Sequence, residues 1–337
     1  MSVLVTGGAG YIGSHTCVTL LEAGYEVVAL DNLSNSSKEA IRRVEKITGK
    51  TIKLYEGDVL DRDFLKRIFE KEDIEFCIHF AGLKAPAESV AKPMEYYYSN
   101  LNGLMILTEI MNEYGCKKLI FSSSAAVYGV VDEVPITENC KKSGCSTPYG
   151  WTKALSEQML MDLYTSDTSW NIVILRYFNP IGAHESGLIG ESPDSIPNNL
   201  MPYITKVAVG ELESLNVFGN DYDTVDGTGV RDYIHVMDLA KAHVFAAKKF
   251  DDIPDCRVYN IGTGKGNSVL EVIDAFEKAT GMTVPYVIKG RRPGDVAVSY
   301  CSPEKACEEL GWSAKYDLLK MCEDSWKWQK NNPKGYK

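Results

Sequence analysis

The sequence predicts an α/β protein with a doubly wound parallel sheet, followed by a smaller C-terminal domain of mixed α/β structure. Two observations support this prediction. Apolar strand-like runs alternate with amphipathic helical stretches as far as about residue 180, and Gly-, Pro-, Asn- and Asp-rich sequence with few helical stretches follows. Strands separated by crossover helices are typical of parallel sheets. We therefore expect one domain at residues 1–180 and a second at residues 181–337.

A glycine-rich turn joins the first predicted strand to the first predicted helix. The apolar run Ser2–Thr6 leads into the segment Gly7–Gly13. Glycines here allow a tight turn, let the backbone approach a pyrophosphate, and bring the helix close to the strand. The helix N-terminus offers N–H groups and a positive dipole end to the same anion. The turn therefore predicts a dinucleotide site of the Rossmann type, with Gly7, Gly10 and Gly13 among its contacts.

The second predicted strand, Glu26–Leu30, ends in an acidic residue. Asp31 follows Gly13 by 31 − 13 = 18 residues, close to the spacing of an acid that binds the adenosine ribose. A carboxylate there repels a 2′-phosphate, and residues 32–36 contain no arginine that could attract one. The pattern favours NAD over NADP. The alternative is an aspartate that only ends a strand.

The alternation of elements continues along the chain, in a pattern that indicates ligand contacts where strands end. Helices are expected up to about residue 23 and near 37–48, 61–72, 86–114 and 149–164, and strands near 52–56, 76–80, 118–121 and 171–175. After residue 180 we expect a helix near 200–210. A helix near 236–250 and a strand at 258–261 follow, so that parts of 236–265 return to the main sheet.

Composition limits the class of partner. The chain has 337 residues, 45% hydrophobic and 24% charged, with a net charge of −10. This charge argues against nucleic acid, and no apolar run reaches the roughly 18 residues that span a bilayer. The nine cysteines show no Cys-x-x-Cys pair, so we expect no metal site. Reduced thiols, and a first strand that leaves no room for a signal peptide, predict a cytoplasmic protein.

Tyr149 and Lys153 lie four residues apart (153 − 149 = 4) at the expected start of a helix. At that spacing their side chains share one helix face, so a phenol and an ammonium can act on one ligand. Gly82, Ser124 and Phe178 fall at or just after predicted strand ends. Their convergence with the tyrosine helix predicts a site there.

These features together resemble the extended short-chain dehydrogenase/reductase family and, within it, the UDP-glucose 4-epimerases, from end to end. The motifs that carry the resemblance are Val3–Gly8, His79–Lys84, Arg176–Pro180, Asn198–Pro202 and Asp226–Val236. The resemblance implies inversion of a UDP-hexose at C4 through transient oxidation with bound NAD, in which residues 181–337 bind the nucleotide sugar.

The resemblance also implies residue roles. Tyr149 would be the acid/base, Lys153 its electrostatic partner and ribose anchor, and Ser124 a hydroxyl bridging to the sugar. Further NAD contacts would come from Tyr11, Ile12, Asp31, Asn32, Leu33, Ser34, Asn35, Ser36, Asp58, Val59, Phe80, Ala81, Gly82, Leu83, Lys84, Ser99 and Phe178. The substrate would be held by Ser124, Tyr149, Asn179, Asn199, Leu200, Asn216, Val217, Phe218, Arg231, Arg292 and Asp295. The two arginines suit a diphosphate, since a guanidinium fork matches phosphate oxygens.

Three positions depart from the family pattern. Pro86-Ala87 replaces a more usual Val-Gly, and Ser99 stands where the family places an asparagine that contacts NAD. Ser299 stands where some members carry a tyrosine against the C2 substituent of the sugar. A small residue there predicts that N-acetylated UDP-hexoses are accepted as well.

A homodimer is also implied, formed through the helix near 86–114 and the Tyr149 helix. The apolar positions of both helices are equally consistent with internal packing. For catalysis, we expect the Lys153 ammonium and the positive nicotinamide to lower the pKa of Tyr149 from about 10 toward 7.

Two other functions compete with epimerisation. A nucleotide-sugar 4,6-dehydratase shares the first oxidation but needs acid and base groups directly after the serine, where this chain has Ala125 and Ala126. A non-catalytic NAD-binding regulator would have no need to keep Ser124, Tyr149 and Lys153 together.

Overall fold

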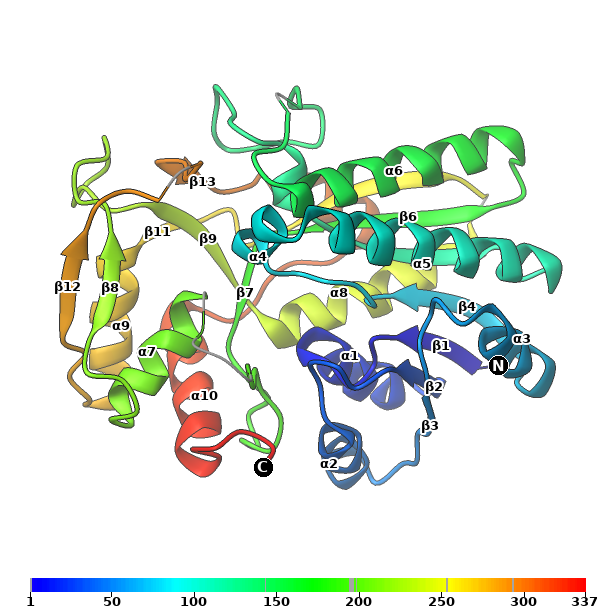
Figure 1. The fold of residues 1–337 in the computed structure, drawn as a ribbon, viewed down its shortest axis with the longest axis horizontal. Helices are drawn as coiled ribbons and strands as arrows, with labels where there is room; N and C mark the ends of the chain where they lie inside the picture. The colour runs from blue at the N-terminus through cyan, green and yellow to red at the C-terminus, as the bar shows by residue number, and fades with distance from the viewer. Residues whose placement is uncertain (1, 143, 194–196, 198, 253, 293) are drawn as a thin grey trace. The chain divides into compact units, whose positions relative to one another are not determined.

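The computed structural model describes residues 2–142, 144–193, 197, 199–252, 254–292 and 294–337, and it confirms the α/β alternation (Figure 1). Asn198, part of one quoted motif, lies outside the described residues. The strands are β1 Ser2–Thr6, β2 Glu26–Asp31, β3 Lys53–Glu56, β4 Ile74–His79, β5 Lys118–Ser124, β6 Asn171–Tyr177, β7 Asn179–Ile181, β8 Leu215–Phe218, β9 Val230–His235, β10 Cys256–Ile261, β11 Gly266–Ser268, β12 Tyr286–Lys289 and β13 Val298–Ser299.

The α-helices alternate with these strands through the first half of the chain. They are α1 Tyr11–Glu22, α2 Lys38–Thr48, α3 Arg62–Lys71, α4 Pro86–Ala91, α5 Pro93–Glu113, α6 Pro148–Ser166, α7 Leu200–Ala208, α8 Val236–Lys248, α9 Val269–Thr280 and α10 Leu318–Asn331. Three short helical turns are η1 Ala125–Val127, η2 Lys249–Asp251 and η3 Ala306–Leu310.

The chain forms two compact units. The first combines the chain up to Val131 with Cys140–Tyr177 and Ala240–Tyr259. The second combines Asp132–Asn139, Phe178–Leu239 and Asn260–Lys337. Each unit carries its own set of predicted site residues.

The first unit is built on a seven-stranded sheet with the strand order β10-β6-β5-β4-β1-β2-β3. Strand β1 pairs in parallel with β2 on one side and with β4 on the other. The chain order reverses at this point, and ligands of such sheets bind outside the carboxyl ends of the strands there. Thr6, the last residue of β1, pairs with Leu30 and with His79. The glycine turn therefore begins at the reversal.

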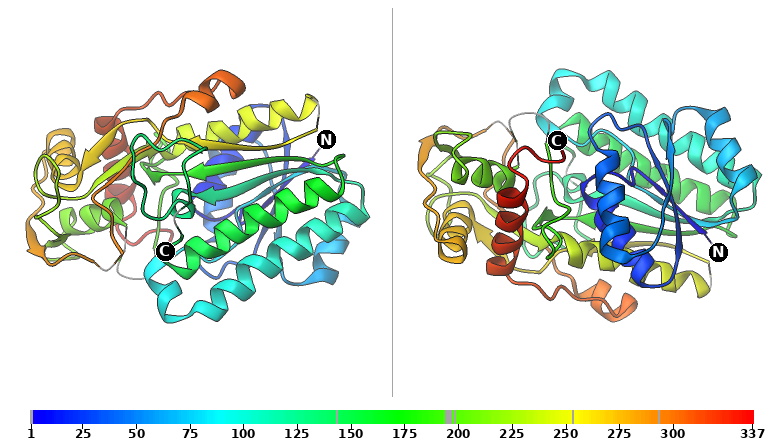
Figure 2. Two further views of the ribbon diagram at one scale, coloured as in Figure 1. Left: turned by 90° about the horizontal axis from the view of Figure 1, so that it is seen from above. Right: turned by 90° about the horizontal axis from the view of Figure 1, so that it is seen from below.

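Helices cover both faces of this sheet. Helices α3, α5 and α6 pack on one face, where Leu4, Leu30 and Ile172 join their buried side chains in one cluster. Helices α1 and α2 lie on the opposite face, as the two views of Figure 2 show. Val3 and Val5 alternate with Leu4 and are also fully buried. Each such side chain contributes about 1.5–3 kcal/mol on burial, so both layers stabilise the sheet.

The prediction of one helix at residues 86–114 is wrong in one respect, because the structure has two helices there. Helix α4 ends at Ala91, and α5 begins with Pro93 at its first position. A proline inside a helix removes a backbone donor and clashes with the preceding turn, so it begins a new helix instead. Lys92 between the two has φ −131° and ψ 54°, outside the helical region.

Strand β5 and helix α6 place the serine and tyrosine motifs. Strand β5 reaches Ser124, beyond the predicted end at Phe121, because three buried or half-buried serines continue the strand after the apolar alternation stops. Helix α6 begins at Pro148, and the Thr147 side chain caps it by accepting from the Gly150 amide at 3.2 Å. This cap fixes the first turn, which contains Tyr149.

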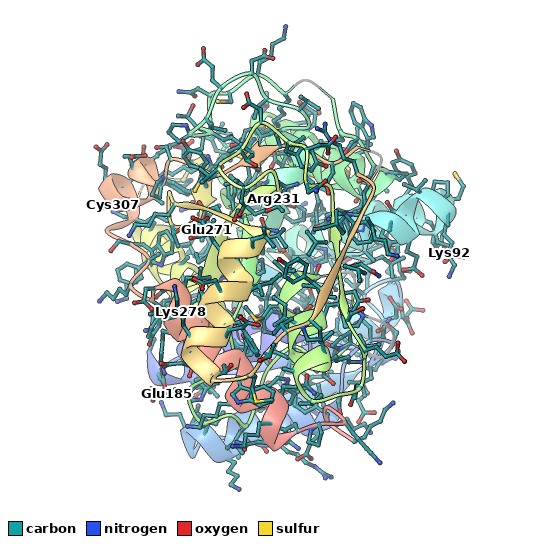
Figure 3. All side chains as sticks on the ribbon, turned by 90° about the vertical axis from the view of Figure 1, so that its left-hand side faces the viewer. Lys92, Glu185, Arg231, Glu271, Lys278 and Cys307 are labelled. Atoms are coloured by element: carbon teal, nitrogen blue, oxygen red, sulfur yellow. The ribbon has the colours of Figure 1, made fainter. Side chains whose placement is uncertain are left out.

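The second unit holds smaller sheets around its own core. Strand β9 pairs in parallel with β7 and β13 and antiparallel with β11, while β8 pairs with β12. Helix α9 begins with a capping box between Ser268 and Glu271, and Lys278 lies in its last turn (Figure 3). Helices α7, α9 and α10 bury Ile204, Phe276 and Met321 in one cluster with β8 and β9. These elements position the arginines described below.

Candidate active site

The glycine turn after β1 has no room for a side chain at Gly7, Gly8 or Gly13. Gly7 adopts a positive φ of 72°, and its amide donates to the Leu30 carbonyl at 2.7 Å. A Cβ atom at Gly13 would lie 2.2 Å from the Gly7 carbonyl oxygen, and one at Gly8 would lie 2.8 Å from the Ala29 Cβ. The turn therefore packs directly on the start of α1, as the predicted phosphate site requires.

The N-terminus of α1 suits an anionic ligand. Its N-cap residue, Gly10, provides no side-chain hydrogen bond, and the first turn contains no acidic residue. The first turn thus contributes no carboxylate of its own to neutralise the positive end of the helix dipole. With the glycine packing, this makes the segment fit the pyrophosphate of a dinucleotide.

Asp31 is a buried residue that joins three segments of the predicted cofactor site. Its carboxylate accepts from the Ala9 amide at 2.9 Å, from the Leu33 amide at 2.9 Å and from the Ser36 hydroxyl at 2.6 Å. Leu33 has a positive φ of 58°, so the carboxylate holds a turn that most residues disfavour. Carboxylate oxygens have lone pairs beyond these bonds. Asp31 therefore both shapes the loop and can accept a ribose hydroxyl.

Asn32 and Asp58 meet beside this loop. The Asn32 amide group donates to the Asp58 carboxylate at 2.8 Å, and the Leu60 amide donates to the other oxygen at 2.9 Å. Val59 between them is buried in the core. The structure therefore brings the segments 31–36 and 58–59 together, whereas the sequence only placed each after a strand.

The segment after β4 lies against the end of β1. The Phe80 amide donates to the Thr6 carbonyl at 3.0 Å, and the Thr6 hydroxyl shares a hydrogen bond of 2.8 Å with His79 Nδ1. Lys84 lies with its ammonium 6.0 Å from the centre of the Tyr11 ring. The predicted contacts at 80–84 therefore adjoin the glycine turn.

Asn100 is a positioning residue that sequence reasoning missed. Buried on α5, it accepts from the Leu83 amide at 2.8 Å and donates to the Leu83 carbonyl and the Thr152 hydroxyl, each at 3.0 Å. Ser99, the predicted cofactor contact, is its half-buried neighbour. Asn100 shares the buried face of α5 with Tyr96 and Leu104, a four-residue spacing that could have indicated it.

Tyr149 and Ser124 come together at the end of β5. The Tyr149 amide donates to Ser89 Oγ at 3.1 Å, which ties α6 to α4. Burial raises the pKa of the Tyr149 phenol, and a hydrogen bond with Ser124 opposes this rise. In the chain by itself, the expected lowering of this pKa is therefore not found. Burial favours the neutral phenol, and a further positive charge is needed to reverse it.

Lys153 lies one turn further along α6 and is buried. Its ammonium donates to the Ser122 carbonyl at 2.6 Å and lies 4.9 Å from the centre of the Phe121 ring. Burial lowers the pKa of Lys153 to about 8, although the charge of Glu157 raises it. Burial, together with the charge of Lys153, also lowers the pKa of His79 to about 3, so this imidazole is neutral.

In the second unit, two arginines converge on one carboxylate. Arg231 of β9 donates from Nη2 to one Asp295 oxygen at 2.5 Å, and Arg292 donates from Nε and Nη2 to the other, each at 3.1 Å. The Arg292 guanidinium also lies 5.0 Å from the centre of the Phe218 ring. Figure 3 labels Arg231 in this unit. The cluster presents two cations and an aromatic face, a combination suited to a nucleoside diphosphate.

The other predicted substrate contacts of this unit lie around β7, β8 and β9. Asn216 and Phe218 share the half-buried face of β8, whereas the Val217 side chain is buried, so only the backbone of Val217 is available to a ligand. Asn216 donates to the Tyr203 hydroxyl at 3.2 Å. Ser299 of β13 pairs with Arg231.

Three remaining residues lie elsewhere in the second unit. Asn179 is exposed on β7 and pairs with Tyr233. Asn199 is the N-cap residue of α7, directly before Leu200, but its side chain makes no capping bond and donates instead to Glu191 at 3.0 Å. The Phe178 side chain is buried, and its amide donates to the Ile261 carbonyl at 3.2 Å. In the part of the chain that the structure describes, no hydrogen bond or ion pair joins Asn179 or Asn199 to the arginine cluster.

Among the described residues, no group of three His, Cys, Asp or Glu side chains is arranged to hold a metal ion. No helix in the described ranges is both long and apolar enough to cross a bilayer.

Comparison with known proteins decides the family. The model of the NAD dependent epimerase/dehydratase family matches residues 3–262. The chain belongs to this family. A relative from Bacillus subtilis (strain 168), a UDP-glucose 4-epimerase, is 59% identical over 337 residues, which cover 100% of this chain and 99% of the relative.

Two solved structures extend this similarity within the epimerase/dehydratase family. The UDP-glucose 4-epimerase from Bifidobacterium longum, in complex with NAD+ and UDP, superposes with a TM-score of 0.97 at 55% identity, covering 99% of this chain and 100% of that one. The UDP-Glc/GlcNAc 4-epimerase from Campylobacter jejuni has a TM-score of 0.85 at 36% identity, covering 98% of this chain and 99% of that one.

The family name includes dehydratases, so the residues after Ser124 are informative. Ala125 and Ala126 form the short helix η1, and the Ala126 amide donates to Ser124 Oγ at 3.2 Å. Neither side chain can carry a proton. The position that a dehydratase would use for elimination is therefore chemically inert in this member of the family.

Proposed function

We propose that this chain interconverts UDP-glucose and UDP-galactose by transient oxidation at C4 with bound NAD. The observation that carries the proposal is the hydrogen-bonded Tyr149–Ser124 pair at the end of β5, one helical turn from the Lys153 ammonium. The first unit also contains the glycine turn and Asp31. An acid/base beside a dinucleotide site is the minimum that oxidation of a carbinol requires.

The cofactor is NAD, held by the first unit. The pyrophosphate would bind at the glycine turn and the N-terminus of α1. The adenosine ribose would bind Asp31. The segments 58–59 and 80–84 would flank the bound dinucleotide. Ser99 of this unit completes the set there, and Phe178, which belongs to the second unit, is the one proposed NAD contact outside the first unit. Bound NAD supplies a reversible oxidation at the sugar C4 and, in its oxidised form, a positive charge in the site.

Tyr149 takes the proton of the 4-hydroxyl and later returns it. Because burial alone raises the pKa of this phenol, Lys153 must remain charged for the phenolate to form. Ser124 donates or accepts between the phenol and the sugar hydroxyl. The Ser122 carbonyl, at 2.6 Å from Lys153 Nζ, fixes the direction of the ammonium.

The UDP moiety is held by the second unit. Arg231 and Arg292 are the proposed diphosphate donors, and Asp295 orients both guanidinium groups before substrate arrives. Phe218 provides an apolar face beside Arg292. The remaining proposed contacts are Asn179, Asn199, Leu200, Asn216, the backbone of Val217, and Ser299.

One assay tests this function. The purified chain is incubated with UDP-glucose without added NAD, and UDP-galactose is measured. A redox-neutral cycle predicts turnover that depends on the NAD retained during purification, and Tyr149→Phe should reduce kcat by about 10³-fold or more. A 4-keto-6-deoxy sugar product would indicate the dehydratase instead. Intact bound NAD with no product from any UDP-hexose would indicate the regulator.

We extend this function to N-acetylated UDP-hexoses. Ser299 is small and pairs with Arg231 in neighbouring strands, so it faces the proposed nucleotide-sugar site without filling it. The resemblance to a UDP-Glc/GlcNAc enzyme of similar fold supports this extension.

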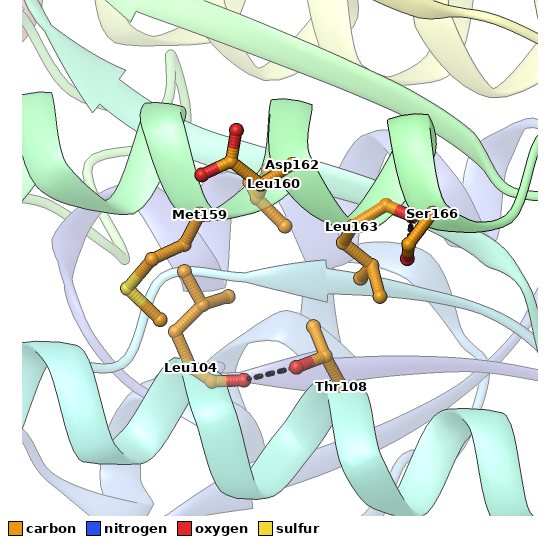
Figure 4. Close-up of a pocket in the computed structure, with 7 residues that line it drawn as sticks. All are labelled: Leu104, Thr108, Met159, Leu160, Asp162, Leu163 and Ser166. Atoms are coloured by element: carbon orange, nitrogen blue, oxygen red, sulfur yellow. Dashed lines mark hydrogen bonds between the residues drawn. The ribbon is translucent and has the colours of Figure 1, made fainter.

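We also propose a homodimer that forms through α5 and α6. The two helices lie side by side with a pocket between them (Figure 4), and it is lined by Leu104, Thr108, Met159, Leu160, Asp162, Leu163 and Ser166. Met94, Tyr98, Trp151 and Leu155 are exposed on α5 and α6. Exposed apolar residues on adjacent helices are typical of an interface.

We also propose a cytoplasmic location. The cysteines of the described part form no disulfide, which supports it.

A further inference from the structure

Glu157 is a fully buried carboxylate on the helix that carries the catalytic pair. It lies four residues after Lys153 (157 − 153 = 4), on the same face of α6. It accepts from the Ser123 hydroxyl at 2.6 Å and from Arg176 Nε and Nη2 at 2.9 and 2.7 Å. Lys142 donates to it at 2.8 Å. This network joins α6 to the ends of β5 and β6.

The Glu157 carboxylate is ionised. Burial, the largest influence, raises its pKa, but the bonds and charges of Arg176 and Lys142 together hold that pKa below its ordinary value. Arg176 is itself fixed, because its Nη1 donates to the Tyr128 hydroxyl at 2.7 Å and its guanidinium lies 4.8 Å from the centre of that ring. A buried carboxylate with this many donors is held in one position.

Glu157 is the anion in the surroundings of Lys153. The groups that face the ammonium are Tyr149 and Glu157 from α6, His79 from β4, and the Phe121 ring and Ser122 carbonyl from β5. The imidazole is neutral because its pKa is about 3, and burial keeps the phenol neutral at rest. In the chain by itself, Glu157 is the one among these groups that carries a negative charge at neutral pH.

We propose that Glu157 is a positioning residue for the reaction, whose buried charge keeps the Lys153 ammonium protonated. A buried amine loses its proton more easily than an exposed one, and an anion one helical turn away opposes that loss. The pKa of Lys153, lowered by burial to about 8, already includes the raising effect of Glu157. Without it, this amine becomes neutral within the physiological range, and the phenolate loses its neighbouring cation. This inference rests on the proposed function.

The test is Glu157→Gln, which keeps the size and removes the charge. The pKa of Lys153 is measured directly in the holoenzyme by nuclear magnetic resonance of isotope-labelled lysine, with Lys153→Met to assign the signal. We expect this pKa to fall by about one unit, as a unit charge at helical-turn distance in a partly screened interior predicts. The alkaline limb of the kcat–pH profile should move to lower pH by a similar amount. An unchanged Lys153 pKa overturns the proposal.

Glu72→Gln is the matched control. Glu72 is a buried carboxylate of the same unit, paired with Lys53 and Tyr55 at 2.6 and 2.7 Å, and it does not face Lys153. The Glu72→Gln variant should lower the midpoint of thermal unfolding without changing either the pKa of Lys153 or the kcat–pH profile. A profile that moves equally in both variants shows a purely structural effect and also overturns the proposal.

A second variant tests the proposal even if Glu157→Gln does not fold. Glu157→Gln leaves Arg176 buried without its carboxylate, whereas the double change with Arg176→Gln removes both charges and is better tolerated. In the double variant, the Lys153 pKa should lie between those of the wild type and Glu157→Gln. A value below that of Glu157→Gln contradicts the proposal, because removal of a nearby cation cannot lower the pKa of an amine. Failure of the wild type to convert any UDP-hexose would reject the proposed function, whereas the lysine titration still decides the role of Glu157.

Discussion

Asn100 accepts a hydrogen bond of 2.8 Å from the Leu83 amide and returns one of 3.0 Å to the Leu83 carbonyl. Its amide group also reaches the Thr152 hydroxyl at 3.0 Å, and that hydroxyl donates to the Tyr149 carbonyl at 2.8 Å. One buried side chain therefore connects the segment proposed to flank NAD with the first turn of the catalytic helix.

Asn100→Leu should weaken both NAD retention and stability. The change keeps the side-chain volume but leaves the buried Leu83 amide and carbonyl without their partner, which costs about 1–3 kcal/mol. Chemical denaturation measures the loss, and the ratio of NAD to protein after purification measures retention. Asn112→Leu, at an exposed position of the same helix, is the control and should change neither. Undiminished NAD content in Asn100→Leu would show that the 80–84 segment positions itself.

The strand and helix pattern of the first unit could be read from the sequence because each element buries a regular apolar face. The order of the strands follows from the crossover rule, which places β4 on the other side of β1 from β2. The end of β5 could not be read in this way, since Ser122 and Ser123 are polar and yet buried. Pro93 marks the helix break in the sequence, but the apolar periodicity on both sides of it predicts one continuous helix.

The polar contacts of the site were less predictable, since hydrogen bonds between distant segments leave no local pattern. The sequence suggested Ser99 from the family pattern, whereas the structure shows the next residue, Asn100, as the buried link. Likewise, Arg231 and Arg292 were expected as phosphate donors, but their shared partner in this structure, Asp295, appears only once β9 is folded against the following loop. Glu157 lies in phase with Tyr149 and Lys153, a signal that was present but not specific.

The Tyr149 phenol should titrate at lower pH when NAD is bound. In the chain by itself, burial raises the pKa of this group, so the phenolate requires the added positive charge of the oxidised cofactor. Ultraviolet difference titration of the NAD-bound protein, with Tyr149→Phe subtracted, should show phenolate below about pH 9, a unit under the ordinary value. The protein stripped of NAD should show it only above that value. Identical curves with and without NAD would reject this electrostatic account.

Lys153→Met should abolish turnover and yet stabilise the fold near neutral pH. The pKa of Lys153 falls from 10.5 to about 8 on burial, so the charged amine opposes folding. At about 1.36 kcal/mol per pKa unit, this fall corresponds to about 3 kcal/mol, and the lost bond to the Ser122 carbonyl offsets about 1 kcal/mol, leaving a net gain of about 2 kcal/mol.

The sign of this effect fixes its pH dependence. Below the folded-state pKa of about 8, the cost of the buried charge is present in full, and it declines as the pH rises toward 10.5. The stability gain of Lys153→Met, measured by denaturant titration at matched NAD content, should therefore be largest below pH 8 and fade above it. Lys46→Met, at an exposed position of α2, should show no such trend. A gain that grows with pH would contradict the linkage.

Ser299→Tyr should reduce activity on UDP-N-acetylglucosamine while leaving activity on UDP-glucose. A phenol at this position would fill the space beside Arg231 that the C2 N-acetyl group needs. The ratio of kcat/KM for the two sugars is the measurement, and we expect it to fall by about 10-fold or more, the effect of a lost fit in a pocket. Val298→Tyr is the control, because adjacent strand residues point to opposite faces. Absence of turnover of the N-acetyl sugar by the wild type would reject the extension outright.

Leu155→Glu should convert the proposed homodimer to a monomer. Leu155 on α6 is 41% exposed, close to other exposed apolar residues of α5 and α6, and a charge there would have to be buried unpaired in the interface. Sedimentation velocity should then show a species of half the wild-type mass. Leu319→Glu is matched in substitution and in exposure, at 45% on α10, and should leave the mass unchanged. Since Leu155 is not among the proposed NAD contacts, the monomer should still retain NAD. A wild-type protein that sediments as a monomer would instead assign these apolar residues to the ordinary exposed surface.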